Sequence, residues 1–189
     1  NSGRKKRMEL ISYMEVVLDS AAAERAHPAF NKLFIESEFI EGHGIFLSAR
    51  RGDRSGTGAR LMHMVKSNVK LSGNVEYEND RLRFIGRNNS VQNPTAVMEN
   101  QPFSNSAEFS ADPIMSFRVS ADIEAESSAS FYFITGICSG RDSAVKISEE
   151  LSYIPHLEDI NVKFRLQSAI ELKYLNISGS ELNAFQDLI

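Results

Sequence analysis

The sequence predicts a mainly β fold, an antiparallel β-sandwich followed by C-terminal helices. The prediction depends on a change of pattern near residue 139. Before it, short runs rich in Phe, Ile and Val alternate with polar residues and are separated by Gly, Asn, Ser and Pro, which is typical of antiparallel strands. After it, apolar residues recur at helical spacing and glycine becomes scarce. We therefore expect a sandwich over residues 1–138 and helices over residues 139–189.

Eight segments of the first region have the composition of strands. They are Met8–Leu18, Lys32–Ile40, Gly44–Arg51, Leu61–Lys70, Asn74–Glu78, Arg81–Gly86, Ile114–Ile123 and Ser130–Cys138. Glu41–Gly44 is a predicted tight turn, because Gly42 and Gly44 can adopt positive φ. Gly52–Gly58 is a predicted charged loop. Asn88–Asp112 is too long for a routine connection, so we expect it to carry function or contacts.

Three helices are predicted after residue 139. The first spans about Arg141–Leu151, with Ser139 or Ser143 as its cap. The second spans Pro155–Leu175 and begins with a proline in its first turn. The third begins at Ser178, which forms a capping box with Glu181 and precedes an apolar stretch that continues to Ile189.

Composition excludes several classes of protein. The 189 residues include 21 Lys and Arg against 25 Asp and Glu, a net charge of −4, so overall charge does not favour nucleic-acid binding. The single cysteine, Cys138, excludes an internal disulfide framework and a Cys-rich zinc site. No apolar run approaches the roughly 20 residues of a membrane helix, and no secretory signal precedes the first strand. Because the chain starts at Asn1 and its earliest methionine is Met8, we interpret it as a segment of a longer polypeptide.

Few residues form patterns typical of catalysis. Glu36 and Glu38 lie two positions apart on a predicted strand, roughly 6–7 Å from each other, a spacing that glycosidases also use. A solvated strand face explains the pair better. The four histidines lack metal-binding spacing, and Cys138 has no neighbour that would activate its thiol, so structural roles are favoured for all five.

Two groups of polar residues are candidate binding sites. Arg50, Arg51 and Arg54 lie beside or within the Gly52–Gly58 loop, and their guanidinium groups can hold sugar hydroxyls, carboxylates or phosphate, although a charged surface loop explains them better. Asn79 and Asp80 suit a turn between two strands. Asp80 and Arg81 either pair with each other or support an active site from its rim, and the residues alone do not decide between these alternatives.

Several motifs resemble those of the bacterial cyclic β-1,2-glucan synthases. The resemblance covers most of the chain from Met8 onward, with order and spacing kept. It rests on His27-Pro28-Ala29-Phe30-Asn31-Lys32-Leu33-Phe34-Ile35-Glu36-Ser37-Glu38, Ala49-Arg50-Arg51 with Arg54-Ser55, Tyr77-Glu78-Asn79-Asp80-Arg81 with Phe84-Ile85-Gly86-Arg87, Asp112-Pro113-Ile114, and Thr135-Gly136 with Ser139-Gly140-Arg141.

The resemblance implies a fold and an activity. The matching region is the glycoside-phosphorylase-like module of those enzymes, related to cellobiose and chitobiose phosphorylases. There, a galactose-mutarotase-like supersandwich is joined by linker helices to an (α/α)6 barrel, so residues 139–189 would be the linker and the start of the barrel. The family activity is inverting phosphorolysis, in which a carboxylic acid on the barrel protonates the glycosidic oxygen while phosphate attacks the anomeric carbon. That acid would lie downstream of this chain.

We therefore expect a noncatalytic, carbohydrate-associated segment that is inactive alone. The arginines Arg50, Arg51, Arg54, Arg81 and Arg87, together with Asp80, would bind carbohydrate or form the rim of its site. The resemblance implies no cofactor and no metal. Expected partners are a β-glucan oligosaccharide, phosphate, the rest of the parent polypeptide and a second copy of the chain, but no nucleic acid or membrane. The expected location is cytoplasmic, with the parent enzyme anchored in the inner membrane by other segments. The alternatives are a stand-alone carbohydrate-binding or assembly module and, ranked last, a glycosidase that uses Glu36 and Glu38.

Overall fold

The computed structural model describes residues 3–50, 59–178 and 181. Within it the chain divides into two compact units, residues 1–150 and residues 151–189, which are described separately. The predicted boundary after residue 138 stays a prediction.

The first sheet is built around one long strand. This strand, β7 (Pro113–Ile123), pairs antiparallel with β1 (Lys6–Ile11) and β2 (Met14–Glu15) on one side and with β6 (Glu76–Asp80) on the other. The predicted strand Met8–Leu18 is thus interrupted between β1 and β2, where the backbone N–H of Ser12 donates to Phe117 O at 2.9 Å. Most of β7 is buried, which agrees with its apolar sequence.

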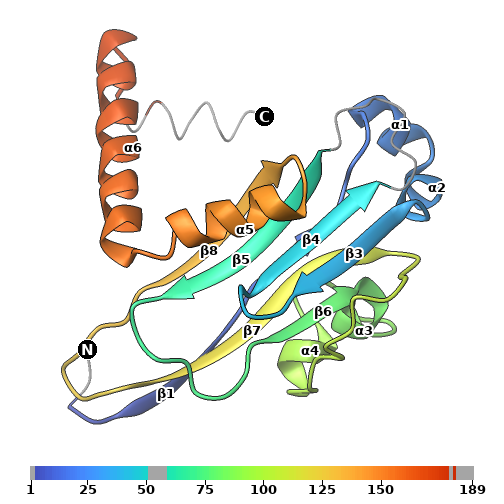
Figure 1. Ribbon diagram of the computed structural model, residues 1–189, viewed down its shortest axis with the longest axis horizontal. Helices are drawn as coiled ribbons and strands as arrows, with labels where there is room; N and C mark the ends of the chain where they lie inside the picture. The colour runs from blue at the N-terminus through green and yellow to red at the C-terminus, as the bar shows by residue number, and fades with distance from the viewer. Residues whose placement is uncertain (1–2, 51–58, 179–180, 182–189) are drawn as a thin grey trace. The chain divides into compact units, whose positions relative to one another are not determined.

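The second sheet has four antiparallel strands in the order β3-β4-β5-β8 (Figure 1). Its strands are β3 (Ile35–Ile40), β4 (Ile45–Arg50), β5 (Arg60–Ser67) and β8 (Phe131–Cys138). The predicted turn Glu41–Gly44 joins β3 to β4, and both Gly42 (φ 82°) and Gly44 (φ 63°) have positive φ. The predicted loop Gly52–Gly58 lies outside the described residues.

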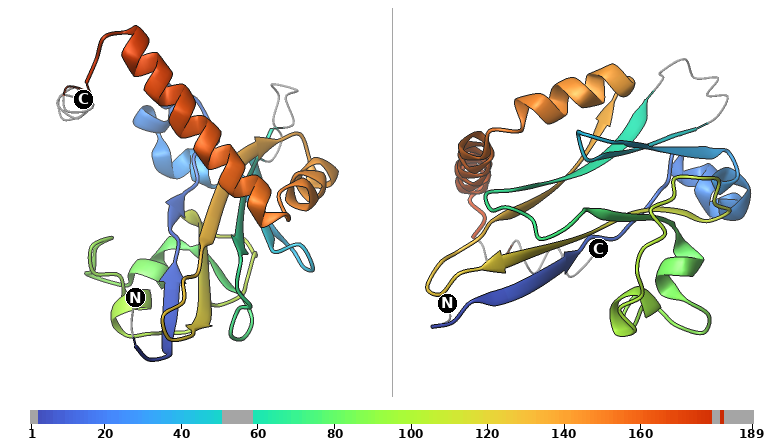
Figure 2. Two further views of the ribbon diagram at one scale, coloured as in Figure 1. Left: turned by 90° about the vertical axis from the view of Figure 1, so that its left-hand side faces the viewer. Right: turned by 60° about the horizontal axis from the view of Figure 1, so that its bottom comes forward.

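The core lies between the two sheets. Aromatic rings from both sheets meet there: Phe39 stacks on Tyr77 with ring centroids 4.0 Å apart, and Phe46 and Phe117 are fully buried. The other face of the second sheet is covered by α5 (Arg141–Glu150), where Lys66 on β5 donates to Ser148 at 2.9 Å (Figure 2). Two antiparallel sheets packed face to face confirm the predicted sandwich.

The prediction of a strand at Arg81–Gly86 is wrong. These residues form a short helix, α3 (Arg81–Ile85), because the Asp80 side chain caps it by accepting from the Arg83 N–H at 2.9 Å. Gly86 ends the helix at φ +85°, and a Cβ there would meet Thr95 Oγ1 at 1.9 Å. Asn79 and Asp80 therefore do not form a turn between two strands. They end β6 and begin α3.

Three other short helices are absent from the sequence prediction. They are α1 (Ala21–Ala26), α2 (Pro28–Lys32) and α4 (Thr95–Met98). Familiar signals accompany the first two: Ser20 accepts from the Ala23 N–H as an N-cap, and Pro28 occupies the first turn of α2.

The second unit contains one long helix, α6 (Ile154–Tyr174), close to the predicted span. At its C-terminal side, the Ser178 N–H donates to Glu181 Oε2 at 2.7 Å and the Glu181 N–H donates to Ser178 Oγ at 3.4 Å. This reciprocal pair is the predicted capping box. The apolar stretch expected after it lies outside the described residues.

Candidate functional site

Five polar side chains that are distant in sequence converge at one end of the first sheet. We call Tyr13, Glu15, Lys32, Arg81 and Asp112 the charged cluster. Tyr13 and Glu15 come from the β1–β2 segment, Lys32 from the end of α2, Arg81 from the start of α3, and Asp112 from the residue before β7. The cluster thus joins three motifs that were far apart in the sequence analysis.

The members of the charged cluster bind one another. Arg81 Nε donates to Glu15 Oε1 at 2.9 Å and to the Tyr13 hydroxyl at 3.2 Å, while that hydroxyl donates to Glu15 Oε1 at 2.9 Å. Asp112 lies between two cations, with Lys32 Nζ at 2.6 Å and Arg81 Nη1 at 3.7 Å. The Arg81 backbone N–H also donates to Asp112 O at 3.1 Å. Two cations and two carboxylates form a neutral, closed network.

Three members of the charged cluster, Tyr13, Glu15 and Arg81, have shifted pKa values. Burial, together with the hydrogen bond to Glu15, raises the pKa of Tyr13 to about 12. Burial also raises the pKa of Glu15, but hydrogen bonds from Tyr13 and Arg81 outweigh it and hold that pKa below its usual value. The hydrogen bond to Glu15 raises the pKa of Arg81. None of these three groups has a pKa near 7, where general acid–base catalysis is most effective, so the arrangement suits tethering.

Asp80 and Arg81 do not pair with each other. Asp80 caps α3 through Oδ1 and accepts from Ser110 Oγ at 3.0 Å through Oδ2, whereas Arg81 turns to Glu15, Tyr13 and Asp112. The Arg81 side chain is 36% exposed, so it lies at the surface without being free of contacts. Of the two alternatives from the sequence, mutual pairing is excluded by this geometry.

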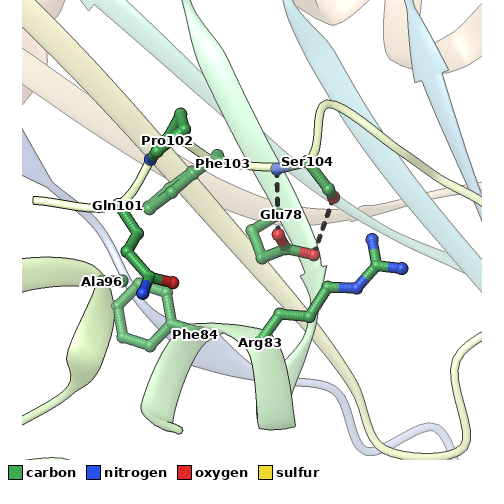
Figure 3. A pocket seen from close by; sticks show the side chains of 8 residues that line it. All are labelled: Glu78, Arg83, Phe84, Ala96, Gln101, Pro102, Phe103 and Ser104. Atoms are coloured by element: carbon green, nitrogen blue, oxygen red, sulfur yellow. Dashed lines mark hydrogen bonds between the residues drawn. The ribbon is translucent and has the colours of Figure 1, made fainter.

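A small pocket of about 160 Å³ lies beside α3, between β6 and residues 101–104 (Figure 3). Glu78 faces it but is only 3% exposed, and its carboxylate accepts from the Ser104 N–H and hydroxyl and from the N–H groups of Asn79 and Asp80, each at 3.0–3.1 Å. Ligand sites for small molecules usually enclose roughly 300–1,000 Å³. The pocket is below that range, and the carboxylate holds the 101–104 segment to β6.

Arg118 on β7 anchors the same long segment. It is 4% exposed, donates to Gln101 O at 2.7 Å and Ala96 O at 2.5 Å, and lies over the Phe103 ring at 4.4 Å. Residues 88–112 therefore carry contacts, as the sequence analysis expected of a segment of that length. Sequence reasoning missed Arg118 and Glu78, although a lone arginine inside the apolar run Ile114–Ile123 is a usable signal.

The remaining predicted arginines are not part of the charged cluster. Arg50 forms an ion pair with Asp19 at 2.6 Å and lies over the Phe34 ring at 5.5 Å. Arg87 is exposed after α3. Arg51 and Arg54 lie outside the described residues.

The weaker candidates from the sequence occupy ordinary structural positions. Glu38 forms an ion pair with Arg141 of α5 at 2.8 Å, and Glu36 is exposed on β3. His63 is buried between Ser12 and Thr135, each 2.9 Å from one of its ring nitrogens. Cys138 is buried. Across the part of the chain that the structure describes, no group of His, Cys, Asp and Glu could hold a metal ion.

No described helix is both long and apolar enough to cross a membrane.

Comparisons with known proteins agree with this architecture. Residues 1–153 match the model of the glycosyl hydrolase 94 supersandwich domain. The whole chain is also 27% identical, over 194 aligned residues, to a protein from Rhizobium meliloti (strain 1021) named cyclic beta-(1,2)-glucan synthase NdvB. The chain spans 7% of the length of that relative. Because the family model covers most of the chain and the two-sheet architecture fits it, the chain belongs to the glycosyl hydrolase 94 supersandwich domain family.

Proposed function

We propose that this chain is a noncatalytic supersandwich segment of a cyclic β-1,2-glucan synthase-like enzyme, in which other segments process the glucan chain by inverting phosphorolysis. The observation that carries the proposal is the closed charged cluster. Its acids and bases bind one another and join β2, α2, α3 and β7 at one end of the sheet. Such a network orders a surface without offering a free acid or nucleophile.

The chemistry of the family agrees with this role. Phosphorolysis needs an acid that can reach the glycosidic oxygen, and it needs the substrate enclosed and positioned. Glu15 is held below its usual pKa, and the carboxylate of Glu78 is occupied by four donors. The partners of the complete enzyme would be a β-glucan oligosaccharide, inorganic phosphate and the rest of the parent polypeptide, on the cytoplasmic side of the membrane that anchors it.

In this proposal some polar residues reach the rim of the sugar site. Exposed Arg87 and half-buried Arg81 are the candidates with described geometry near α3, and Arg50 is a further one at the end of β4. Asp80 would act indirectly, because its carboxylate fixes the start of α3. Arg51 and Arg54 stay proposals from the sequence.

Incubating the purified chain with β-1,2-glucan oligosaccharides and phosphate tests the proposal. We expect neither glucose 1-phosphate nor new reducing ends. The matched control replaces Glu36 and Glu38 by Gln. If the parent chain cleaves the oligosaccharides and the double variant does not, the proposal is overturned in favour of a glycosidase.

A binding experiment separates the segment from a stand-alone carbohydrate-binding module. Titration of the chain with the same oligosaccharides, followed by NMR, should show no saturable shifts. In the complete enzyme, Arg87→Ala should raise the KM for glucan, whereas Lys70→Ala, also at an exposed position, should leave it unchanged. Saturable binding by the chain alone would favour the stand-alone module instead.

A further inference from the structure

One edge strand of the sandwich differs from the others in charge. Among the described strands, the edges of the first sheet are β1 with β2 and β6, and those of the second are β3 and β8. Charged side chains lie on every edge except β8: Lys6, Arg7, Glu9, Glu15, Glu36, Glu38, Glu76, Glu78 and Asp80. The β8 sequence, Phe-Tyr-Phe-Ile-Thr-Gly-Ile-Cys, contains no charge and no proline. Charges and prolines on edge strands prevent unwanted pairing, so β8 lacks the usual protection.

The β8 edge is also regular. It pairs with β5 over eight consecutive residues without a register shift, whereas β6 has a shift between Glu78 and Asp80. Bulges disturb the ladder and twist an edge away from a partner. An edge without a bulge instead presents its backbone groups at the spacing that another strand needs.

The backbone groups that face outward on β8 can be identified. At the end of the β5–β8 ladder, the Asn68 N–H donates to Ser130 O at 3.2 Å. In an antiparallel ladder, directly opposed residues alternate between bonded and non-bonded pairs. The even-numbered residues of β8 therefore bond to β5, and the outward N–H and C=O groups belong to Phe131, Phe133, Thr135 and Ile137. The Ile137 side chain is 62% exposed.

We propose that β8 is the association surface for a second copy of this chain, which adds its own β8 antiparallel to the first. A two-fold axis beside Ile134 places Phe131 opposite Ile137 and Phe133 opposite Thr135, so all four outward residues find partners. In this register the equivalent faces of the two copies lie on the same side of the joined sheet. The two four-stranded sheets then form one continuous sheet of eight strands. The interface is isologous, as closed dimers require.

Charge argues for a second copy as the occupant. Two β8 strands meet without any charged side chain, so no like charges oppose each other. Self-pairing of β3 would bring Glu36 and Glu38 toward their own copies, and like charges directly opposite each other destabilise a strand pair. Unlike β3, β8 therefore carries no charged side chain that would oppose its own copy.

Sedimentation of the purified chain across a wide concentration range, with matched variants at one position, tests this dimer. Ile137→Pro removes an outward N–H without removing a bond to β5, and edge strands tolerate proline at such positions. Ile137→Ala keeps the N–H and removes the exposed side chain. We expect the parent chain and Ile137→Ala to dimerise and Ile137→Pro to associate at least ten-fold more weakly, with circular dichroism unchanged in all three.

Amide hydrogen exchange provides a readout that does not depend on a variant. The N–H groups of Phe131, Phe133, Thr135 and Ile137 should become protected as concentration rises, while those of the even-numbered β8 residues stay protected throughout. A parent chain that is monomeric at every concentration would overturn the proposal. A dimer that persists in Ile137→Pro with the amides of Phe131, Phe133 and Thr135 unprotected would place association elsewhere. Protection seen only within a longer polypeptide would identify a strand of the parent as the occupant.

Discussion

Stability of the sandwich should depend on pH through His63. This residue on β5 is 3% exposed and lies between the two sheets, with its ring stacked against Phe117 at 5.2 Å. Its ring nitrogens lie 2.9 Å from the hydroxyls of Ser12 and Thr135. Burial lowers the pKa of His63 from 6.5 to about 4, so the folded chain keeps the imidazole neutral.

Linkage gives the direction and size of the effect. Between pH 6.5 and about 4 the unfolded chain binds a proton on His63 that the folded chain does not. The free energy of unfolding therefore falls as the pH is lowered through this window, by about 2 kcal/mol at pH 5 relative to pH 7.5. Well above pH 6.5 neither state is protonated at this residue, and the contribution is constant.

Urea unfolding followed by far-ultraviolet circular dichroism measures the effect, since the chain contains no tryptophan for fluorescence. The control is His63→Gln, which retains polar atoms but does not titrate. Carboxylates add their own pH dependence to both proteins, so the quantity to compare is the difference between them. If parent and variant lose the same stability between pH 7.5 and pH 5, the argument that His63 is held neutral by burial is refuted.

Three further substitutions test the contacts that order the surface. Arg118→Ala removes a buried guanidinium and should lower the free energy of unfolding by about 3 kcal/mol. The control Arg87→Ala, at an exposed position, should change it by less than about 0.5 kcal/mol. Equal effects of the two variants in chemical denaturation would contradict the anchoring role of Arg118. Asp80→Ala removes the cap of α3 and should cost about 1 to 2 kcal/mol, while Asp80→Asn retains an acceptor and should recover most of the loss. Arg81→Ala should cost up to about 1 kcal/mol, because its ion pairs are more than a third exposed. A melting temperature identical to that of the parent would show that the contacts of Arg81 contribute no stability.

Local composition was sufficient to predict the positions of most strands in the sandwich. Apolar residues predicted the ends of β4, β5, β7 and β8 to within three residues. They did so because side chains along a strand face the two sides of its sheet in turn, so burial leaves a regular pattern in the sequence. The spans of α5 and α6 followed from helical periodicity in the same way. The sequence was misleading at Arg81–Gly86, where alternation suggested a strand but the Asp80 cap and positive φ at Gly86 favoured a helix.

The site depended on contacts that no sequence spacing encodes. Motif resemblance singled out Lys32, Arg81 and Asp112 as parts of separate segments, and only the packing of α2, α3 and β7 brings them into one network. Tyr13 and Glu15 belong to the predicted strand Met8–Leu18, yet the break after β1 places them beside Arg81. Periodicity thus determined which residues are strands and helices, since it reflects local burial. Which charges neutralise one another was decided by the tertiary structure, since ion pairs depend on distances between chain segments that are far apart in sequence.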